Sequence, residues 1–464
     1  MTNPYNKTTH GRIGGQGWLA MALVCVAFLL PVSAKAQHYP TTLTAEERFF
    51  GLSTVWKEIS STFAAPESHT TPDPDSLYKA FVPKVLLAIN DYAYYRLLQQ
   101  FAASFRDANT YVEMPEHLRD SLVIPPIEIS EVRGRFYVTN IDRSLAGKLP
   151  IGSEILRING FETSLFLQNE ILPYLSASTA HGRMAMALAH LLEGWVNTGV
   201  MINARAPDGS NLNERVKRVP TGRLQWMRTP LSTEPIAFER GNRDIAVITL
   251  NSFSAETMRA IQTNRMLGRA QSVILDLRNC RHEESLENIV RAALLFADLN
   301  RLILPGFAVR QTPYAFSSPQ PGELQHAGQH REVSRYRFSP PDTLRSLHRY
   351  RTAEPINLPL VILVGPYTGN GAEHFLMMLR QSPFRAVLVG ERTAGAIGGS
   401  IKTPLPGGGV LSVNARYDIY PDDMWITHGF VPDIPTPADI KSILNSDDLP
   451  MLKALEYLSR SEER

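Results

Sequence analysis

Apolar, strand-like runs alternate with helical segments from residue 239 onward, and this alternation constrains the fold more than any other feature. Runs that are apolar on both faces and separated by helices are typical of a buried, largely parallel sheet covered by helices. An α/β core is therefore expected over residues 239–437. Its predicted strands are 245–250, 272–277, 359–364 and 386–389, and its predicted helices are 285–299 and 370–380.

The chain before this core divides into two regions with different periodicity. Apolar residues recur every three or four positions over 44–59 and 75–105, which predicts two helices and a helical cap at 37–122. Thr44 and Glu47 have the spacing of a capping box. Residues 123–218 change to short strand-like runs separated by turns, which predicts a separate β-rich module.

Three further segments complete the expected organisation. Residues 219–238 form a linker, and residues 438–464 form a C-terminal helix. Residues 305–351 form a polar insertion with seven Arg, three His and three acids. A solvated loop or hairpin is the simpler interpretation of this insertion, and a lid or a surface for an anionic partner is the alternative.

The first 36 residues resemble a secretory signal peptide. Lys7 and Arg12 precede an apolar run, 18–30, that is short for a membrane span, and the small-x-small sequence 34–36 follows. Cleavage there would leave Gln37 as the N-terminus and no stable membrane span. We therefore expect an exported protein, in the periplasm or outside the cell, and an uncleaved anchor is the alternative.

The exported part is electrostatically balanced, with 44 Lys and Arg against 45 Asp and Glu. This balance gives no reason to expect a nucleic-acid partner. Cys280 is its one thiol, so no internal disulfide can form. The glycine-rich run 395–399 lacks the Gly-Lys-Ser/Thr ending of a nucleotide loop. No metal and no cofactor are predicted.

Four motifs in their order along the chain resemble the tail-specific (C-terminal processing) serine peptidases, in particular the tricorn-core-like branch. The resemblance implies an α+β protein with a helical cap, a PDZ-like module at 123–218 and a ClpP/crotonase-like core. It also implies cleavage of polypeptides, commonly near their C-termini, by a serine nucleophile. The motifs are Val273–Asn279, Ala372-Glu373, Gly390–Gly395 and Gly429–Ile434.

The positions that carry the family's chemistry differ in this chain. The serine stands three residues before the glutamate that matches Glu373, and here that residue is Asn370. A carboxamide is no nucleophile, and Asn370 with Glu373 has instead the spacing of a capping box. The histidine base of the tricorn-like branch corresponds to Asn109, which cannot accept a proton near neutral pH. Other members use a lysine in place of this histidine, and the corresponding stretch 394–396 here is Ala-Gly-Ala.

The oxyanion loop also departs from the family pattern. The family has several glycines after its Asp-Leu-Arg-Asn sequence, whereas Cys280 to Glu284 contain none, so the loop donors are expected to point elsewhere. Two fallback nucleophiles remain. Thr368 is the nearest hydroxyl, and Cys280 stands two residues before His282.

The module at 123–218 is expected to capture an extended peptide by strand addition, with Gly134, Arg135, Phe136 and Tyr137 at its groove and Phe136 as an apolar wall. A spacer without a ligand is the alternative. The sequence thus predicts a catalytically inactive peptidase-like protein whose partner is a polypeptide or a protein C-terminus. The alternative is an active serine-type endopeptidase that cuts near C-termini.

Overall fold

The structure is a computed structural model of the chain. The predicted signal peptide and part of the polar insertion lie outside the residues it describes. These residues are 42–66, 69–220, 224–241, 244–297, 301–310, 331–333, 336–339, 342–344, 347, 350–351, 354–381, 386–419 and 428–462.

The N-terminal region is built from three helices where two were predicted. Thr44 and Glu47 form both hydrogen bonds of the predicted capping box. The predicted helix at 75–105 is two helices, because Asn90 caps a new helix by accepting a hydrogen bond from Ala93 N–H. Asp73 caps the first of these, and Pro83 lies within it. The helices are α2 (Ala45–Thr62), α3 (Pro74–Leu86) and α4 (Asp91–Ala103).

The predicted α/β core contains a six-stranded sheet in the order β10-β11-β12-β18-β19-β22. Every neighbouring pair is parallel except β10 with β11, and β10 was not predicted from the sequence. The strands are β10 (Ile236–Arg240), β11 (Ile245–Leu250), β12 (Ser272–Asp276), β18 (Leu360–Val364), β19 (Val387–Gly390) and β22 (Ile434–Pro435).

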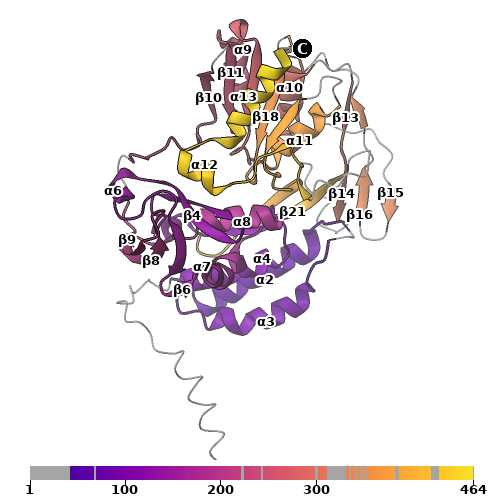
Figure 1. The fold of residues 1–464 in the computed structure, drawn as a ribbon. Coiled ribbons are helices and arrows are strands. Elements are labelled where there is room, and N and C mark those ends of the chain that lie inside the picture. Colours follow the sequence, from indigo (N-terminus) through magenta and orange to yellow (C-terminus); the bar gives the residue numbers. More distant parts are fainter. Residues whose placement is uncertain are drawn as a thin grey trace, which may run out of the picture. The chain divides into compact units, whose positions relative to one another are not determined.

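Helices cover both faces of this sheet. On one face, Ile248 and Leu275 pack with residues of α9 (Ala255–Thr263), α10 (Leu286–Phe296) and α11 (Gly371–Leu379). On the other face, the alternate residues Val247 and Ile274 pack against α13 (Leu449–Glu462), which lies next to β18 in Figure 1. The predicted C-terminal helix is two helices, because α12 (Ile440–Asn445) precedes α13.

Residues 123–218 contain a second, antiparallel sheet in the order β3-β4-β5-β8-β9, with β6 paired to β5. Helix α8 (Ala180–Ala189) contacts the edge strand β3. The module has its own apolar core, which includes Phe136, Val138 and Ile202. The strands are β3 (Ile127–Val132), β4 (Arg135–Ile141), β5 (Glu154–Ile158), β6 (Phe161–Glu162), β8 (Gly199–Arg205) and β9 (Asn211–Lys217).

A third sheet joins the N-terminal helical region to the core. Strand β1 pairs with β21, which also pairs with β20 and with β14 of the polar insertion. The described parts of the insertion are thus largely strands, in line with its interpretation as a hairpin. The sheet contains β1 (Tyr111–Glu113), β14 (Gly306–Arg310), β15 (Arg331–Val333), β16 (Tyr336–Ser339), β20 (Gly399–Pro404) and β21 (Val410–Ile419). Among the described residues, no helix is long and apolar enough to cross a membrane.

Candidate functional site

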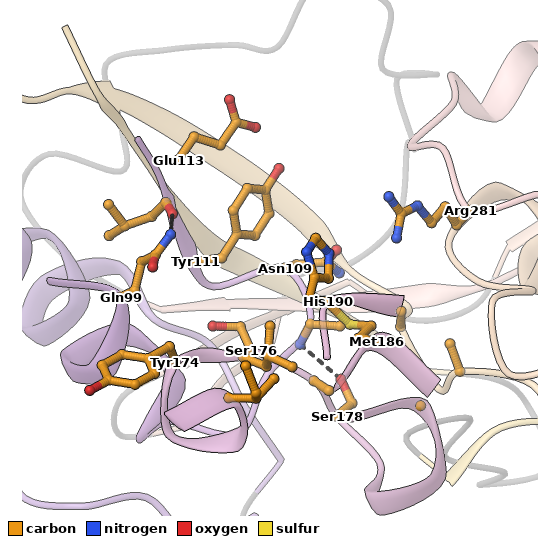
Figure 2. Close-up of a pocket in the computed structure, with 18 of the residues that line it drawn as sticks. Gln99, Asn109, Tyr111, Glu113, Tyr174, Ser176, Ser178, Met186, His190 and Arg281 are labelled. Atoms are coloured by element: carbon orange, nitrogen blue, oxygen red, sulfur yellow. Dashed lines mark hydrogen bonds between the residues drawn. The ribbon is translucent and has the colours of Figure 1, made fainter. Parts of the chain in front are cut away.

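A cavity of about 1500 Å³ lies where the helical region, the β-rich module and the core meet. Figure 2 shows side chains from all three regions along its wall. Both positions that match the family's catalytic residues, Asn109 and Asn370, line this one cavity. Its lining includes Asn109, Tyr111, Glu113, Tyr174, Ser178, Met186, His190, Arg281, His282, Glu283, Tyr367, Asn370, Ser400 and Lys402.

Asn370 stands in a sharp turn between β18 and α11 with φ 47° and ψ −116°. A residue with a Cβ rarely adopts such angles, and their cost is of order 1–3 kcal/mol. A strained turn from a strand into a helix exposes the nucleophile in the α/β-hydrolases. The chain thus has the backbone of a nucleophile's turn and a carboxamide at its apex.

The side chain of Asn370 does not cap α11, so the predicted capping box is wrong. Its Nδ2 instead donates a hydrogen bond to the carbonyl oxygen of Arg281 at 3.1 Å. Its Oδ1 is buried and has no hydrogen-bond partner among the described residues. The reason for the error is geometric: at these backbone angles the side chain turns from the helix start toward the 281–284 loop.

The 281–284 loop packs against the start of α11, next to Asn370. The N–H of Gly371, the first residue after the turn, donates to the carbonyl oxygen of His282 at 3.2 Å. In hydrolases with such a turn, the N–H that follows the nucleophile helps to bind the developing negative charge. Here a carbonyl oxygen of the protein already uses that donor, as expected for a loop without glycine.

Two glutamates fix the same loop in place. Glu283 accepts hydrogen bonds from the N–H and hydroxyl groups of Ser400, at 3.1 and 2.9 Å. Glu284 accepts from the Ser252 hydroxyl at 2.7 Å and the Phe253 N–H at 3.0 Å. A Cβ atom added at Gly371 would lie 3.1 Å from the Cβ of Glu284. The loop is therefore packed closely on the helix start and held by side chains from both sides.

Asn109 is held by its own turn at the wall of the cavity. Its N–H donates to Asp107 Oδ1 at 3.0 Å, and its carbonyl oxygen accepts from the Ser412 hydroxyl at 2.9 Å. The other Asp107 oxygen accepts from Asn414 Nδ2 at 3.1 Å. Burial raises the pKa of Asp107, against the effect of these hydrogen bonds and of nearby His69. This network fixes the backbone at position 109 and supplies no base.

The two fallback nucleophiles lie outside the cavity. Thr368 is fully buried, and its hydroxyl donates to the Leu277 carbonyl and accepts from the Gly365 N–H, each at 2.9 Å. Cys280 is 1% exposed within the core cluster, and burial raises the pKa of its thiol. A hydroxyl with both bonds in use and a protonated, buried thiol are poorly suited to attack a substrate.

The predicted peptide groove at Gly134–Tyr137 also needs revision. Gly134 lies in the turn between β3 and β4, and Arg135 begins β4. Phe136 is 7% exposed and packs in the module's own core, so it cannot form the wall of a groove. Strand β4, which contains Tyr137, pairs with β3 and β5, whereas β3 and β9 lie at the edges of the sheet. An added strand would therefore have to pair with an edge strand and not with β4.

Glu373, one turn into α11, shows how the family's scaffold motifs fit together. It is fully buried and accepts hydrogen bonds from the Thr393 hydroxyl, the Gly395 N–H and the Ala396 N–H. Burial raises its pKa to about 7, and these three donors limit the rise. Glu373 thus binds the segment Gly390–Gly395 to the helix without entering the cavity.

Sequence reasoning missed the contacts that join the module to the core beside the cavity. The Thr179 hydroxyl donates to the Ala394 carbonyl at 2.9 Å, and His181 Nε2 lies 2.6 Å from the Thr393 carbonyl. The Tyr367 hydroxyl donates to the Ala185 carbonyl at 2.6 Å. These partners are about 180 to 215 positions apart in sequence, so no local pattern could indicate them.

The described residues contain no group of three or more His, Cys, Asp or Glu placed to hold a metal ion.

The contact between Ser400 and Glu283 was also not predicted from the sequence. It joins a hydroxyl to a carboxylate at the cavity wall at 2.9 Å.

Comparisons with known proteins agree with the resemblance seen in the sequence. Residues 244–436 match the sequence model of peptidase family S41. No curated protein sequence matches the chain significantly. The resemblance to the tail-specific peptidases is therefore confirmed for the core of the chain.

Solved structures extend the likeness of fold beyond the core. Mature CPAF in complex with lactacystin has a TM-score of 0.63 at 15% identity, covering 90% of this chain and 97% of its own. A second structure of mature CPAF has a TM-score of 0.62 at 15% identity and covers 86% and 94%. The photosystem II D1 C-terminal processing protease, with a TM-score of 0.44 at 16% identity over 88% and 99%, is too distant to support an argument. The mixed α/β fold is thus similar to that of mature CPAF.

Proposed function

Since the core of this chain resembles peptidase family S41, we propose that the protein is a peptidase-like scaffold that binds extended polypeptide and does not cleave it. The observation that carries this proposal is the strained turn at position 370. Its backbone is that of a nucleophile's turn, but Asn370 provides no hydroxyl and uses its amide to hold the 281–284 loop. Acyl transfer needs a nucleophile, a base and oxyanion donors together, since these groups act as a unit.

The residue at the expected base position and the occupied oxyanion donor support the same proposal. Asn109 replaces the base, and the Gly371 N–H is engaged by the His282 carbonyl. The cavity itself is retained, with backbone and aromatic surface along its walls. A site that keeps its volume and loses its reactive groups is suited to holding a polypeptide.

Residues 123–218 would act in this protein as a PDZ-like module that helps to capture the polypeptide. One edge of the module's sheet is β3, which contacts α8, and the start of α8 also contacts the core segment 393–394 through Thr179 and His181. A strand added to β3 would therefore lead toward the cavity.

We also propose that the protein is exported, with residues 1–36 removed as a signal peptide. The apolar run and the 34–36 sequence support this. Mass spectrometry of the protein recovered outside the cytoplasm should find Gln37 as its first residue. Retention of residues 1–36 would support an anchored protein instead.

An active serine-type endopeptidase is the second candidate, and one contact favours it. The Ser400 hydroxyl lies 2.9 Å from a carboxylate oxygen of Glu283 at the cavity wall. The other Glu283 oxygen, however, accepts the Ser400 N–H, so the pair resembles a clamp on the backbone. No group orients Glu283 as a base among the described residues, which makes this the weaker candidate.

Binding and cleavage can be separated in one titration of the full chain with a labelled, permanently unfolded polypeptide. We expect saturable binding and, by mass spectrometry, an intact ligand after prolonged incubation. Tyr111→Ala, inside the cavity, should weaken binding, while Tyr457→Ala, on α13 and 40% exposed, should not. Cleavage that disappears in Ser400→Ala would favour the second candidate.

A further inference from the structure

One end of the helix pair α2 and α3 has large apolar side chains on its surface. Trp56, late in α2, donates a hydrogen bond to Asp75 at the start of α3, and Arg48, early in α2, donates to the Ala88 carbonyl just after α3. The helices therefore run antiparallel, and the start of α2 lies beside the end of α3. The large apolar side chains exposed at this end form what we call the apolar patch: Phe49, Phe50, Leu86, Leu87 and Ile89.

Three side chains of the apolar patch stand largely clear of the rest of the protein. Phe50 is 66% exposed, Leu87 is 79% exposed and Ile89 is 82% exposed. Exposed apolar side chains that gather in one place mark an interaction surface. A rigid protein partner would need a socket for each protruding side chain, whereas a lipid bilayer deforms around them.

A buried ion pair fixes the backbone beneath the patch. Arg48 and Asp91 are both buried, with a nitrogen and an oxygen 3.5 Å apart. Arg48 also holds the carbonyl of Ala88, which stands between Leu87 and Ile89. Buried charges are costly unless they are paired and hydrogen-bonded, so this network is a strong constraint on the turn. The exposed side chains are thus presented by a fixed turn, which lowers the entropy lost when they bind.

The charges at this end of the helix pair favour a neutral surface over an acidic one. Glu46 and Glu47 lie in the first turn of α2, and Lys84 lies in the last turn of α3. The ammonium group of Lys84 lies 4.6 Å from the centroid of the Phe81 ring. Binding to anionic lipids uses clusters of basic residues, and two acids with one lysine do not form such a cluster. Apolar contact with neutral lipid is therefore the chemistry that fits this patch.

The chain enters the fold beside the apolar patch. The N–H of Thr42 donates to Asp91 Oδ2 at 3.0 Å, and the N–H of Leu43 donates to Asp91 Oδ1 at 3.3 Å. The apolar run 18–30 precedes this point in the sequence, and a signal peptide or an anchor carries such a run to a membrane. Residues 31–41 can span at most about 40 Å. Export therefore brings this end of the fold close to lipid.

We propose that the apolar patch binds the surface of a lipid bilayer, with Phe50, Leu87 and Ile89 inserted among neutral headgroups. Ile89 also lines the cavity, so this contact brings the cavity to the membrane surface. The inference goes beyond the proposed function and does not depend on what the cavity binds.

The test measures how much protein sediments with vesicles of phosphatidylcholine. The protein is used without residues 1–36, which precede every described element, so that the run 18–30 cannot bind the vesicles itself. We expect saturable binding. Leu87→Ser and Phe50→Ser should each weaken it about tenfold, because each removes one large apolar side chain from the lipid.

Two controls separate the patch from general adhesion. Leu452→Ser changes a leucine on α13 that is 47% exposed, and this variant should bind as the unmodified protein does. Replacing about a third of the lipid with phosphatidylglycerol should not strengthen binding, because Glu46 and Glu47 lie beside the patch. Thermal melting of each variant checks the fold, and both test positions are exposed, so serine should be tolerated.

Three results would overturn this inference and leave the proposed function intact. The first is a lack of binding to phosphatidylcholine vesicles, including binding that appears only with phosphatidylglycerol. The second is binding that survives Leu87→Ser combined with Phe50→Ser. The third is self-association of the unmodified protein without lipid, seen by light scattering and lost in Leu87→Ser, because a second copy of the chain would then cover the patch.

Discussion

The two ends of the first turn of α11 differ in how well their polar groups are satisfied. Glu373 is buried and accepts three hydrogen bonds, from Thr393, Gly395 and Ala396. Asn370, three residues earlier, has strained backbone angles and a buried oxygen without a partner among the described residues. Glu373 therefore helps to hold the fold together, whereas Asn370 lies at the candidate site.

This difference shows what the fold requires and what it does not. A buried carboxylate must be hydrogen-bonded for the core to form, so Glu373 cannot change without loss of stability. The turn at Asn370 is strained whichever non-glycine residue occupies it, and such strain is typical of positions used for function. The structure therefore combines a strained turn with a carboxamide at its apex, which makes position 370 the one to test for function.

The largest effect should follow replacement of Glu373 by Ala. Three donors would lose their acceptor in the core, and we expect a loss of about 4 kcal/mol or more in the free energy of unfolding. Glu373→Gln keeps the shape but places an NH₂ group against a donor, and it should lose about 2 kcal/mol. Urea denaturation measures both losses. A loss below 1 kcal/mol for the Ala variant would show that the hydrogen bonds to Glu373 are not needed for a stable core.

The pH dependence of stability should reveal the raised pKa of Glu373. The folded protein holds this proton up to a pH of about 7, compared with 4.5 for the free group. The contribution of Glu373 is therefore complete below pH 4.5 and is lost as the pH rises through 7, by about 3 kcal/mol. Glu373→Gln cannot titrate, so its stability relative to the unmodified protein should rise by about 3 kcal/mol between pH 4.5 and pH 8. An equal difference at pH 5 and pH 8 would show that the pKa is not raised.

The core strands could be predicted because burial on both faces leaves a clear mark in sequence. Strand β11, over Ile245–Leu250, has the predicted bounds, and β12 ends one residue early. The helix boundary at Asn90 was missed, since apolar residues continue at helical spacing through Ile89 and mask the break. Strand β10 was missed because none of its residues is buried, which weakens the apolar signal.

The positions of the candidate site could be predicted, but its geometry could not. The motif spacing identified Asn370 and Asn109, and both line the cavity. The backbone angles of Asn370 and the bond from Gly371 N–H to His282 depend on packing between distant segments. Local rules therefore gave the wrong role for Asn370, as a helix cap. The groove at Phe136 failed for a related reason, since an apolar residue in an alternating strand can face either side.

Asn370→Gly should change the free energy of unfolding less than the Glu373 substitutions do. Glycine adopts a positive φ without penalty, so relief of strain should offset the lost hydrogen bond to the Arg281 carbonyl. The free energy of unfolding should rise by up to about 1 kcal/mol or stay unchanged. Asn370→Ala, which retains the strain and loses the hydrogen bond, is the matched control and should be less stable. The reverse order would show that the turn is not strained.

The smallest effect should be seen in attempts to restore catalysis. Asn370→Ser alone should give almost no cleavage, because an unassisted hydroxyl stays protonated near neutral pH. Adding Asn109→His should raise the rate, since both positions line one cavity, but only slightly while His282 engages the Gly371 N–H. Cleavage of an unfolded protein, followed by mass spectrometry, measures this. Activity typical of a peptidase in the single variant would mean that another group already acts as the base.

The central claim is that the unmodified chain has no activated nucleophile. Its most direct test is incubation of the purified, unmodified protein with a fluorophosphonate, which reacts with activated serines, followed by intact mass measurement. The protein should keep its original mass, as should the Ser400→Ala variant used as a control. Stoichiometric addition of the probe to the unmodified protein, mapped to a residue in the cavity, would contradict the claim.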